Sequence, residues 1–242
     1  LPELNSDFRY EDLQENAIYI EGESDGAFDN SDYILFYAKG PHDWVVNTTN
    51  ASNTRHRQNI YSDEAYYFIT VADNDGKRVQ AKAPLSTNAS LQITNYDDYT
   101  FLEKEERSIL AAGTQWFFNQ DFNIENTQNF GIKFPNAVAN EDLSIRIRGV
   151  STSVQSSSMT VKVNNQDLYT LNYSQVTPGS LTKATTAERV ATINNSNNFL
   201  DISITYDNGG NPSANAFLDY IEVVGKKQLI ADGSQFSFRS FD

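Results

Sequence analysis

The residues best suited to chemistry are the carboxylates between residues 21 and 32, which follow the spacing of a calcium loop. Such a loop places oxygen ligands at its positions one, three, five, nine and twelve and a glycine at position six. Counting from residue 21, the ligand positions are filled by Glu21, Glu23, Asp25, Asp29 and Asp32, and the glycine by Gly26. A hard divalent cation needs several oxygens at once and would relieve the repulsion among these carboxylates. The spacing therefore predicts bound calcium.

Two departures favour a second interpretation of the same loop. A glutamate opens it where aspartate is usual, and Asp32 is shorter than the bidentate glutamate that normally closes such a loop. The flanking residues are typical of strands rather than of the helices of a helix-loop-helix hand. The alternative is an acidic turn between two strands, in which Gly26 supplies a positive φ.

A second candidate binding site follows an aromatic residue near position 206. Its residues are Tyr206, Asp207, Asn208 and Asn211, interrupted by Gly209 and Gly210. An aromatic ring can stack on the apolar face of a sugar, while Asn and Asp side chains bind its hydroxyl groups. The same glycines also serve an ordinary wide turn, so the structural interpretation stays open.

An independent catalytic site has little support in the residues. The chain has no cysteine, which excludes a cysteine nucleophile, a thiolate metal site and a disulfide framework. Its two histidines are His42, expected in a turn entering a strand, and His56, expected in a solvated loop between two arginines. We predict no catalytic residue in this chain.

Charge and hydropathy exclude two further classes of partner. The 242 residues carry a formal net charge of −14, and the 18 basic residues are scattered. Binding to nucleic acid phosphates needs a basic surface, so a nucleic acid partner is excluded. No apolar run approaches the ~20 residues of a membrane-spanning helix.

Short alternating apolar runs, separated by Gly, Asn, Asp and Pro, predict an all-β fold. In the first part we expect strands at residues 17–21, 33–38, 43–47, 64–72 and 77–81, with Asp75 and Gly76 as a hairpin turn between the last two. In the second part we expect strands at residues 129–134, 143–150, 159–163, 166–173, 189–193, 199–206 and 217–224, with Asn164 and Asn165 as a turn. This number and spacing is typical of a jelly-roll-like β-sandwich.

The remaining pattern predicts one helix and two domains. Residues 102–112 place Leu102 and Ile109 on one face and charged residues on the other, with Gly113 as a C-terminal stop. We expect an N-terminal β-domain over residues 1–99 and a short helix plus sandwich over residues 100–242. Residues 235–241 alternate like a further strand, which leads us to expect more protein after them in the parent chain.

One carboxylate stands among core-facing positions. In the run 218–222, strand periodicity places Asp219 on the same face as Ile221 and Val223. A buried carboxylate must be hydrogen-bonded or ion-paired, so we expect Asp219 to have a structural role.

Eight segments along the chain together carry a family resemblance. The segments before residue 100 are Ile-Glu-Gly-Glu-Ser-Asp-Gly (20–26), Asp-Tyr-Ile-Leu-Phe-Tyr (32–37), Asn-Ile-Tyr-Ser-Asp (59–63) and Ala-Tyr-Tyr-Phe-Ile-Thr (65–70). The later ones are Gly-Thr-Gln-Trp-Phe (113–117), Tyr-Asp-Asn-Gly-Gly-Asn-Pro-Ser-Ala (206–214), Leu-Asp-Tyr-Ile-Glu (218–222) and Gln-Phe-Ser-Phe-Arg (235–239). In this order they resemble the N-terminal region of PorU-type sortases, which are gingipain-like cysteine peptidases of the type IX secretion system of Bacteroidota. The resemblance extends over nearly the whole chain.

The resemblance implies a non-catalytic front region of a cell-surface transpeptidase at the outer membrane. The family's catalytic histidine and cysteine lie in a peptidase domain after this region, and the parent enzyme removes a C-terminal signal from cargo and attaches the cargo to lipopolysaccharide. Implied partners are a PorV-like outer-membrane barrel of the attachment complex, the peptidase domain itself, and cargo or glycan. The alternative function is a stand-alone surface carbohydrate-binding module, because jelly-roll domains of this size commonly bind sugars.

Overall fold

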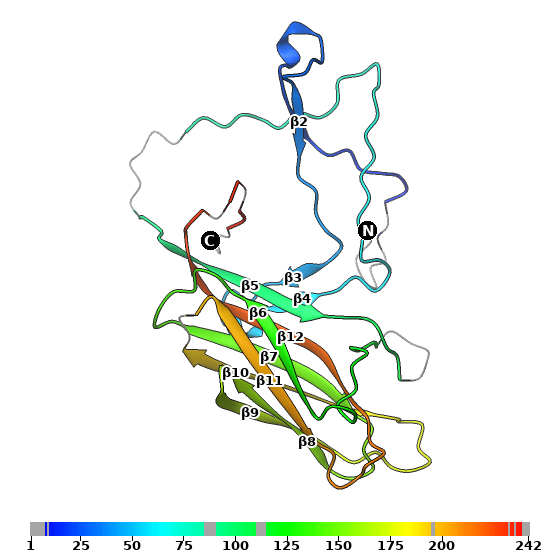
Figure 1. Ribbon diagram of the computed structural model, residues 1–242. Helices are drawn as coiled ribbons and strands as arrows, with labels where there is room; N and C mark the ends of the chain where they lie inside the picture. Colours follow the sequence, from blue (N-terminus) through cyan, green and yellow to red (C-terminus); the bar gives the residue numbers. More distant parts are fainter. Residues whose placement is uncertain are drawn as a thin grey trace. The chain divides into compact units, whose positions relative to one another are not determined.

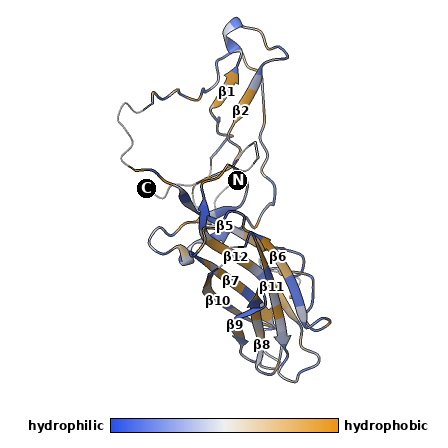
Figure 2. Ribbon diagram, turned by 60° about the vertical axis from the view of Figure 1, so that its left-hand side comes forward, coloured by the Kyte–Doolittle hydropathy of each residue, from blue (hydrophilic) through white to orange (hydrophobic). Residues whose placement is uncertain are grey.

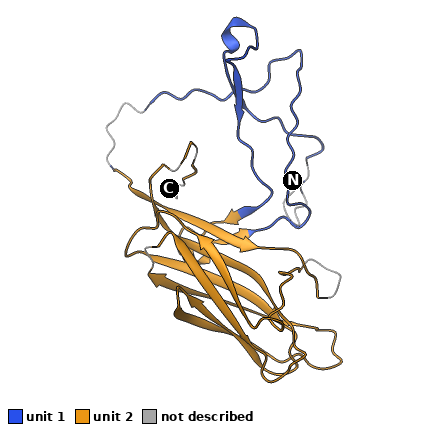
Figure 3. Ribbon diagram, viewed as in Figure 1, with its two compact units in different colours: residues 1–43, 57–91 blue, residues 44–56, 92–242 orange. Residues whose placement is uncertain are grey.

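The computed structural model describes residues 8, 10–84, 91–109, 115–194, 197–231, 233–234 and 236–238. The chain forms two compact units (Figure 3). One comprises residues 1–43 and 57–91, and the other comprises residues 44–56 and 92–242. The second unit therefore includes an early segment of the chain, and this segment carries the site described below.

The second unit is built on two four-stranded sheets whose neighbouring strands are antiparallel (Figure 1). This confirms the predicted all-β sandwich. The first sheet has the order β10 (Thr185–Asn194), β7 (Asp142–Ser151), β12 (Ala216–Gln228), β5 (Asn95–Glu103). The second has the order β6 (Thr127–Lys133), β11 (Phe199–Asp207), β8 (Ser157–Val163), β9 (Gln166–Tyr173).

The core follows from the alternation that predicted the strands. Every second residue of β6 and of β11 is buried, while the residues between them are exposed or half-buried. Ile145, Ile147, Ile202 and Ile204 are completely buried in one apolar cluster that strands of both sheets share. Each such side chain contributes about 1.5–3 kcal/mol on burial. Figure 2 shows the resulting hydrophobic segments along the strands.

The hairpin between β8 and β9 confirms the predicted turn. Asn164 and Asn165 have φ values of 50° and 67°. Two consecutive left-handed residues match the twist of the flanking strands, and asparagine tolerates this conformation better than most residues.

A bulge in β12 changes which of its residues face the core. The register of β12 against β7 shifts between Leu218 and Tyr220. As a result Leu218 joins Ile221 and Val223 in the apolar cluster, although strict alternation had placed it on the opposite face. Tyr220 and Glu222 are buried outside that cluster.

The first unit contains less regular structure than predicted. Strand β1 (Ile18–Glu21) pairs with β2 (Tyr33–Phe36), and the short 3₁₀ turn η1 (Glu23–Asp25) lies between them. Residues 64–72 and 77–81 are all described and form no strand beyond an isolated bridge between Ile18 and Arg78, so both strand predictions are wrong. The side chains of Tyr66, Phe68 and Ile69 are 72–76% exposed, so this alternating run has no core to cover.

The helix predicted over residues 102–112 is wrong where the structure describes it. Leu102 and Glu103 end β5, and residues 104–109 are not helical. Residues 110–112 lie outside the described residues. Leu102 is paired with Ile221 of β12 and packs against the core, so tertiary pairing prevails over helix propensity.

The structure also bears on the expected domain boundary and on the strand expected at the end of the chain. The boundary expected between residues 99 and 100 falls within β5, which belongs wholly to the second unit. Of the strand expected at residues 235–241, residues 236–238 have no regular structure and the others lie outside the described residues. None of the helices in the described part of the chain is both long and apolar enough to span a membrane.

Candidate functional site

The early segment of the second unit brings a histidine onto the sandwich. Strand β3 (Asp43–Val45) and strand β4 (Arg55–Arg57) pair with each other, and the 3₁₀ turn η2 (Ala51–Asn53) lies between them. The Asn47 carboxamide oxygen accepts hydrogen bonds from the backbone N–H groups of Thr49 and Asn50, at 3.1 and 2.8 Å. Asn50 caps η2 by accepting from the backbone N–H of Ser52 at 3.1 Å. These local bonds shape the loop that presents His56.

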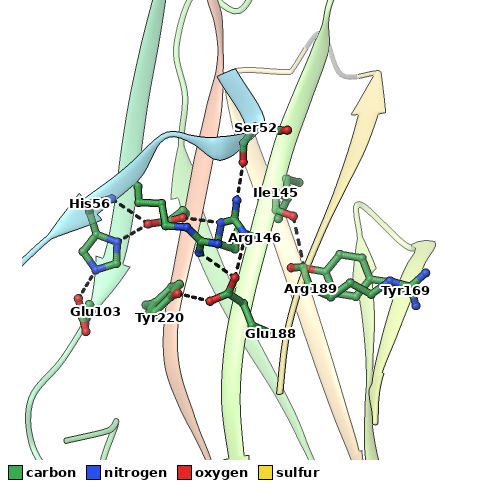
Figure 4. A network of polar contacts seen from close by, with 11 residues as sticks. Ser52, His56, Glu103, Ile145, Arg146, Tyr169, Glu188, Arg189 and Tyr220 are labelled. Carbon is green, nitrogen blue, oxygen red and sulfur yellow. Dashed lines mark hydrogen bonds and ion pairs between the residues drawn. The ribbon is translucent and has the colours of Figure 1, made fainter. Parts of the chain in front are cut away.

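His56 is held between two carboxylates. Its Nδ1 lies 2.5 Å from Glu222 Oε1, its backbone N–H donates to the same oxygen at 2.9 Å, and its Nε2 contacts Glu103 (Figure 4). Glu222 comes from β12 and Glu103 from the end of β5. The His56 side chain is only 6% exposed, so its expected place in a solvated loop is wrong.

Aromatic rings enclose the imidazole and keep water away from it. Phe101 stacks on the His56 ring with centroids 4.5 Å apart and an angle of 8° between the planes. Tyr220 meets the ring edge-on at 4.8 Å, and Trp44 lies 6.0 Å away. These contacts fix the ring plane so that both nitrogens face oxygens.

The surroundings make His56 a cation at neutral pH. Burial alone would lower the pKa of the imidazole, but the hydrogen bonds to Glu103 and Glu222 outweigh it and raise the pKa of His56 to about 9. With both nitrogens bonded to carboxylates, His56 cannot accept a further proton as a general base.

Arg146 extends the network along β7. Its Nε lies 2.9 Å from Glu222 Oε2, and its Nη1 lies 2.8 Å from Glu188 Oε1. Its Nη2 donates to the backbone carbonyl of Ser52, as Figure 4 shows. Arg146 Nε and Glu222 Oε2 have no hydrogen-bond partner in the described structure, so they attract each other as charges without the alignment of a hydrogen bond. The register of the sheet places Glu222 directly opposite Arg146.

Glu188 closes the network on β10. Arg55 Nη1 lies 2.7 Å from its Oε1, and the Tyr220 hydroxyl donates to its Oε2 at 2.6 Å. Burial acts to raise the pKa of the Glu188 carboxyl, but the bonds from Tyr220 and Arg55 hold it below its ordinary value. With His56 protonated, the cations of Arg55, His56 and Arg146 balance the carboxylates of Glu103, Glu188 and Glu222. The network thus joins residues 52–56 to four strands of one sheet.

A neighbouring ion pair confirms the role expected for Asp219. Its carboxylate is buried and lies 2.9 Å from Arg148 Nη1. Burial raises the pKa of Asp219 to about 7, while Arg148 acts in the opposite direction. Asp219 lies at the bulge of β12, between Leu218 and Tyr220.

The five carboxylates of the predicted calcium loop do not converge in the structure. The Tyr19 hydroxyl donates to Glu21, and Glu23 pairs with Arg78 Nε at 2.8 Å. Asp25 accepts from the backbone N–H of Ala27 at 2.9 Å. Asp29 accepts from the N–H and hydroxyl of Ser31 at 2.9 and 2.7 Å, and Asp32 accepts from the N–H of Asp29 at 2.9 Å.

These bonds are typical of side chains that shape a turn. Gly26 has a φ of 76°, as the turn interpretation expects. In the described ranges no group of three or more His, Asp or Glu side chains is arranged to hold a metal ion. Calcium in this loop stays a prediction.

The predicted ligand-binding residues near position 206 are divided between core and loop. Tyr206 is only 3% exposed, and its hydroxyl bonds to Ser151 Oγ at 2.8 Å. Asn208 and Asn211 accept bonds from the backbone N–H groups of Gly210 and Ser213, at 2.9 and 3.3 Å. Asp207 lines a shallow hollow with Ser156, Ser157, Ser158, Asn172, Tyr173 and Ser174.

The network around His56 was missed because its members lie far apart in the sequence. One signal was present: Arg146 and Arg148 alternate with isoleucines in an otherwise apolar strand, and Glu222 interrupts another. Charges in buried strands require partners. A single sequence does not tell which residues pair.

The fold and the network define an antiparallel β-sandwich in which buried charges hold an early segment of the chain against one sheet. The sequence matches no protein-family model and no curated protein.

Among solved structures, dimeric latent PorU from Porphyromonas gingivalis is similar over 100% of this chain, with a TM-score of 0.75 and 21% identity. The chain spans 22% of the length of that PorU chain. The chain therefore has a PorU-like fold.

Two weaker similarities involve about half of the chain. A CBM36 domain of a xylanase from the hindgut metagenome of Trinervitermes trinervoides is similar over 52% of this chain and 96% of its own, with a TM-score of 0.35 and 16% identity. A carbohydrate-binding module CBM36 in complex with calcium and xylotriose is similar over 54% of this chain and 99% of its own, with a TM-score of 0.32 and 14% identity.

Proposed function

We propose that this chain is the non-catalytic N-terminal region of a type IX secretion system cell-surface sortase, where it acts as an accessory scaffold. The observation that carries the proposal is the fold similarity to PorU over the whole chain. The order of segments that resemble PorU-type sortases supports it. On this proposal the chain works at the extracellular side of the outer membrane.

The absence of cysteine is consistent with a region that performs no peptidase chemistry. The peptidase and transpeptidase steps, which transfer cargo to lipopolysaccharide, would belong to another part of the parent protein. The proposed partners of this region are that peptidase domain, a PorV-like barrel of the attachment complex, and cargo.

The His56 network suggests how such a region acts as a scaffold. Buried charges with specific partners favour one arrangement over others, because any displacement leaves a charge without its partner. Arg146 and His56 fasten residues 52–56 to the sandwich through three carboxylates, and this fixes the path by which the chain leaves the second unit.

The first test is to sequence the gene in its native genome and to delete the part that encodes this chain. We expect the reading frame to continue beyond the codon for Asp242 into a domain with a cysteine and a histidine of a gingipain-like peptidase. Deletion of the codons for Leu1–Asp242 from that locus should leave cargo proteins with their C-terminal signal uncleaved, as measured by intact mass. A frame without a peptidase domain, or normal cargo processing after the deletion, would overturn the proposal.

A second candidate function is a surface carbohydrate-binding module. It is favoured by the hollow at Asp207, which is lined mainly by serine hydroxyls and the Asn172 carboxamide. Such groups suit sugar hydroxyls.

A further inference from the structure

The outer face of the sheet β6-β11-β8-β9 carries an ordered row of hydroxyl groups. Thr205 of β11 is paired with Thr127 of β6 on one side and with Thr160 of β8 on the other. Thr160 is in turn paired with Thr170 of β9. The hydroxyls of Thr127 and Thr205 lie 2.9 Å apart. Four threonines therefore cross the sheet in register, with a spacing of roughly 4.8 Å between strands.

A second polar row runs parallel to the first, one outward position further along the strands. Ser158 of β8 is paired with Asp207 of β11 and with Asn172 of β9. All three line the hollow described above, together with Ser156 and Ser174. The hollow is thus the continuation of the threonine row at one end of the sheet.

An exposed aromatic ring lies at the other end of the same face. Phe199 begins β11 and shares its outward side with Thr205 and Asp207. Its side chain is 49% exposed and covers Gly131 of β6, where a Cβ atom would come within 2.3 Å of Phe199 Cζ. From Phe199 to Asp207 the strand extends over roughly 26 Å at about 3.3 Å per residue.

The wall of the hollow is held in place before any ligand arrives. Gly209 has a φ of 65°, and a Cβ atom there would lie 1.9 Å from the Ser156 carbonyl oxygen. The backbone N–H of Gly209 donates to Asp207 Oδ1 at 3.0 Å, and Ser153 Oγ donates to the Asn208 carbonyl at 3.1 Å. A prearranged wall reduces the entropy lost on binding.

The charges on this face favour a neutral ligand. Its outward lysines are Lys133 and Lys162, and Lys162 is paired with Asp167 at 3.2 Å. Asp201 and Asp207 add negative charge on β11, in a chain whose formal net charge is −14. Phosphate or uronate groups would be repelled, whereas sugar hydroxyls can both donate to carboxylates and exchange hydrogen bonds with threonine and serine.

We propose that this face, from Phe199 through the threonine row to the hollow at Asp207, binds a neutral glycan chain. Phe199 would stack on the apolar side of one sugar ring, and the hydroxyl rows would bind the rings that follow. The inference specifies the site and ligand class of the second candidate function above and does not depend on the first.

The test is affinity electrophoresis of the full chain in native gels that contain a soluble β-glucan, a galactomannan or, as the acidic comparison, alginate. We expect retardation in at least one neutral gel. The Thr160→Val/Thr205→Val double variant keeps side-chain shape and removes two hydroxyls, and it should weaken binding about tenfold, as should Phe199→Ala. The matched control is Thr192→Val, at an exposed position on β10 of the other sheet.

Thermal unfolding of each variant separates lost binding from lost folding. Retardation that the variants leave unchanged would overturn this site while glycan binding as such survives. No retardation in either neutral gel, or retardation by alginate alone, would overturn the inference, and the sortase proposal would be unaffected.

Discussion

His56 Nδ1 and Glu222 Oε1 lie 2.5 Å apart although 166 residues separate them in the sequence. The contact joins the early segment of the second unit to β12, the last strand of its sheet in sequence order. It also makes the stability of the fold depend on the protonation of one imidazole.

Stability should fall as pH rises from 7 to 9. The folded state holds the His56 proton up to a pKa of about 9, whereas the unfolded chain releases it near 6.5. The contribution is therefore complete below about pH 6.5 and is lost as pH rises through 9, a change on the order of 3 kcal/mol. Urea unfolding at several pH values measures it.

The control for this effect is His56→Gln, which should be less stable at every pH but lack the fall between pH 7 and 9. Asp219 acts in a lower pH range. Because burial raises its pKa from 3.8 to about 7, its contribution to the free energy of unfolding decreases as pH rises from about 4 to about 7. A wild-type unfolding free energy that stays flat from pH 7 to 9 would contradict the protonated state of His56.

Removal of the central cation should be far more costly than removal of an exposed one. Arg146→Met removes the buried cation that Glu188 and Glu222 share, which leaves Glu222 paired only with His56, and we expect a loss of about 3–5 kcal/mol. Lys162→Met breaks the pair with Asp167, where the lysine side chain is 47% exposed, and should change stability by less than about 1 kcal/mol. Similar losses in both variants would show that the network is not buried in solution.

Two adjacent glycines offer a matched test of the loop beside the hollow. Both have positive φ, but a Cβ atom would collide with the Ser156 carbonyl only at Gly209, and open space surrounds Gly210. Gly210→Ala should cost about 1–2 kcal/mol for the left-handed conformation alone. Gly209→Ala should cost clearly more, and equal melting temperatures for the two variants would refute the close approach.

Calcium binding by the 21–32 loop is measured by titration calorimetry. Because Asp25, Asp29 and Asp32 already accept hydrogen bonds within the turn, we expect any affinity to be no tighter than roughly 10⁻⁴ M, the range of weak extracellular sites. The Asp25→Ala/Asp29→Ala variant tests whether a signal comes from this loop, and Asp201→Ala serves as control. Submicromolar binding that only the first variant abolishes would show that the turn rearranges around the ion.

Much of the sandwich could be predicted because its strands alternate strictly. Residues 129–134 and 199–206 have one apolar face, and both were recognised to within a few residues. Strand β5 was missed because its end, Leu102 and Glu103, leads into a charged run with helix-like spacing. Only its pairing with β12 decides its conformation.

The site was much less predictable than the fold. The arginines of β7 indicated that partners must exist, but the choice of Glu188 and Glu222 depends on strand order and register. His56 lies between two arginines in the sequence, which is typical of an exposed loop. The neighbouring residues do not indicate that its side chain contacts two carboxylates and three aromatic rings in the fold. Long-range pairing of this kind is not encoded in spacing.

The position of β12 within its sheet has a consequence for biosynthesis. β5 lies at the sheet edge with β12 as its neighbour, and β7 lies on the other side of β12. Since β12 spans Ala216–Gln228, a ribosome must make more than 200 residues before β5 can pair or His56 can meet Glu222. During that time the nascent chain has unpaired strand edges, and Arg146 lacks its partner Glu222, so this region is prone to aggregation until its last strand has been synthesised.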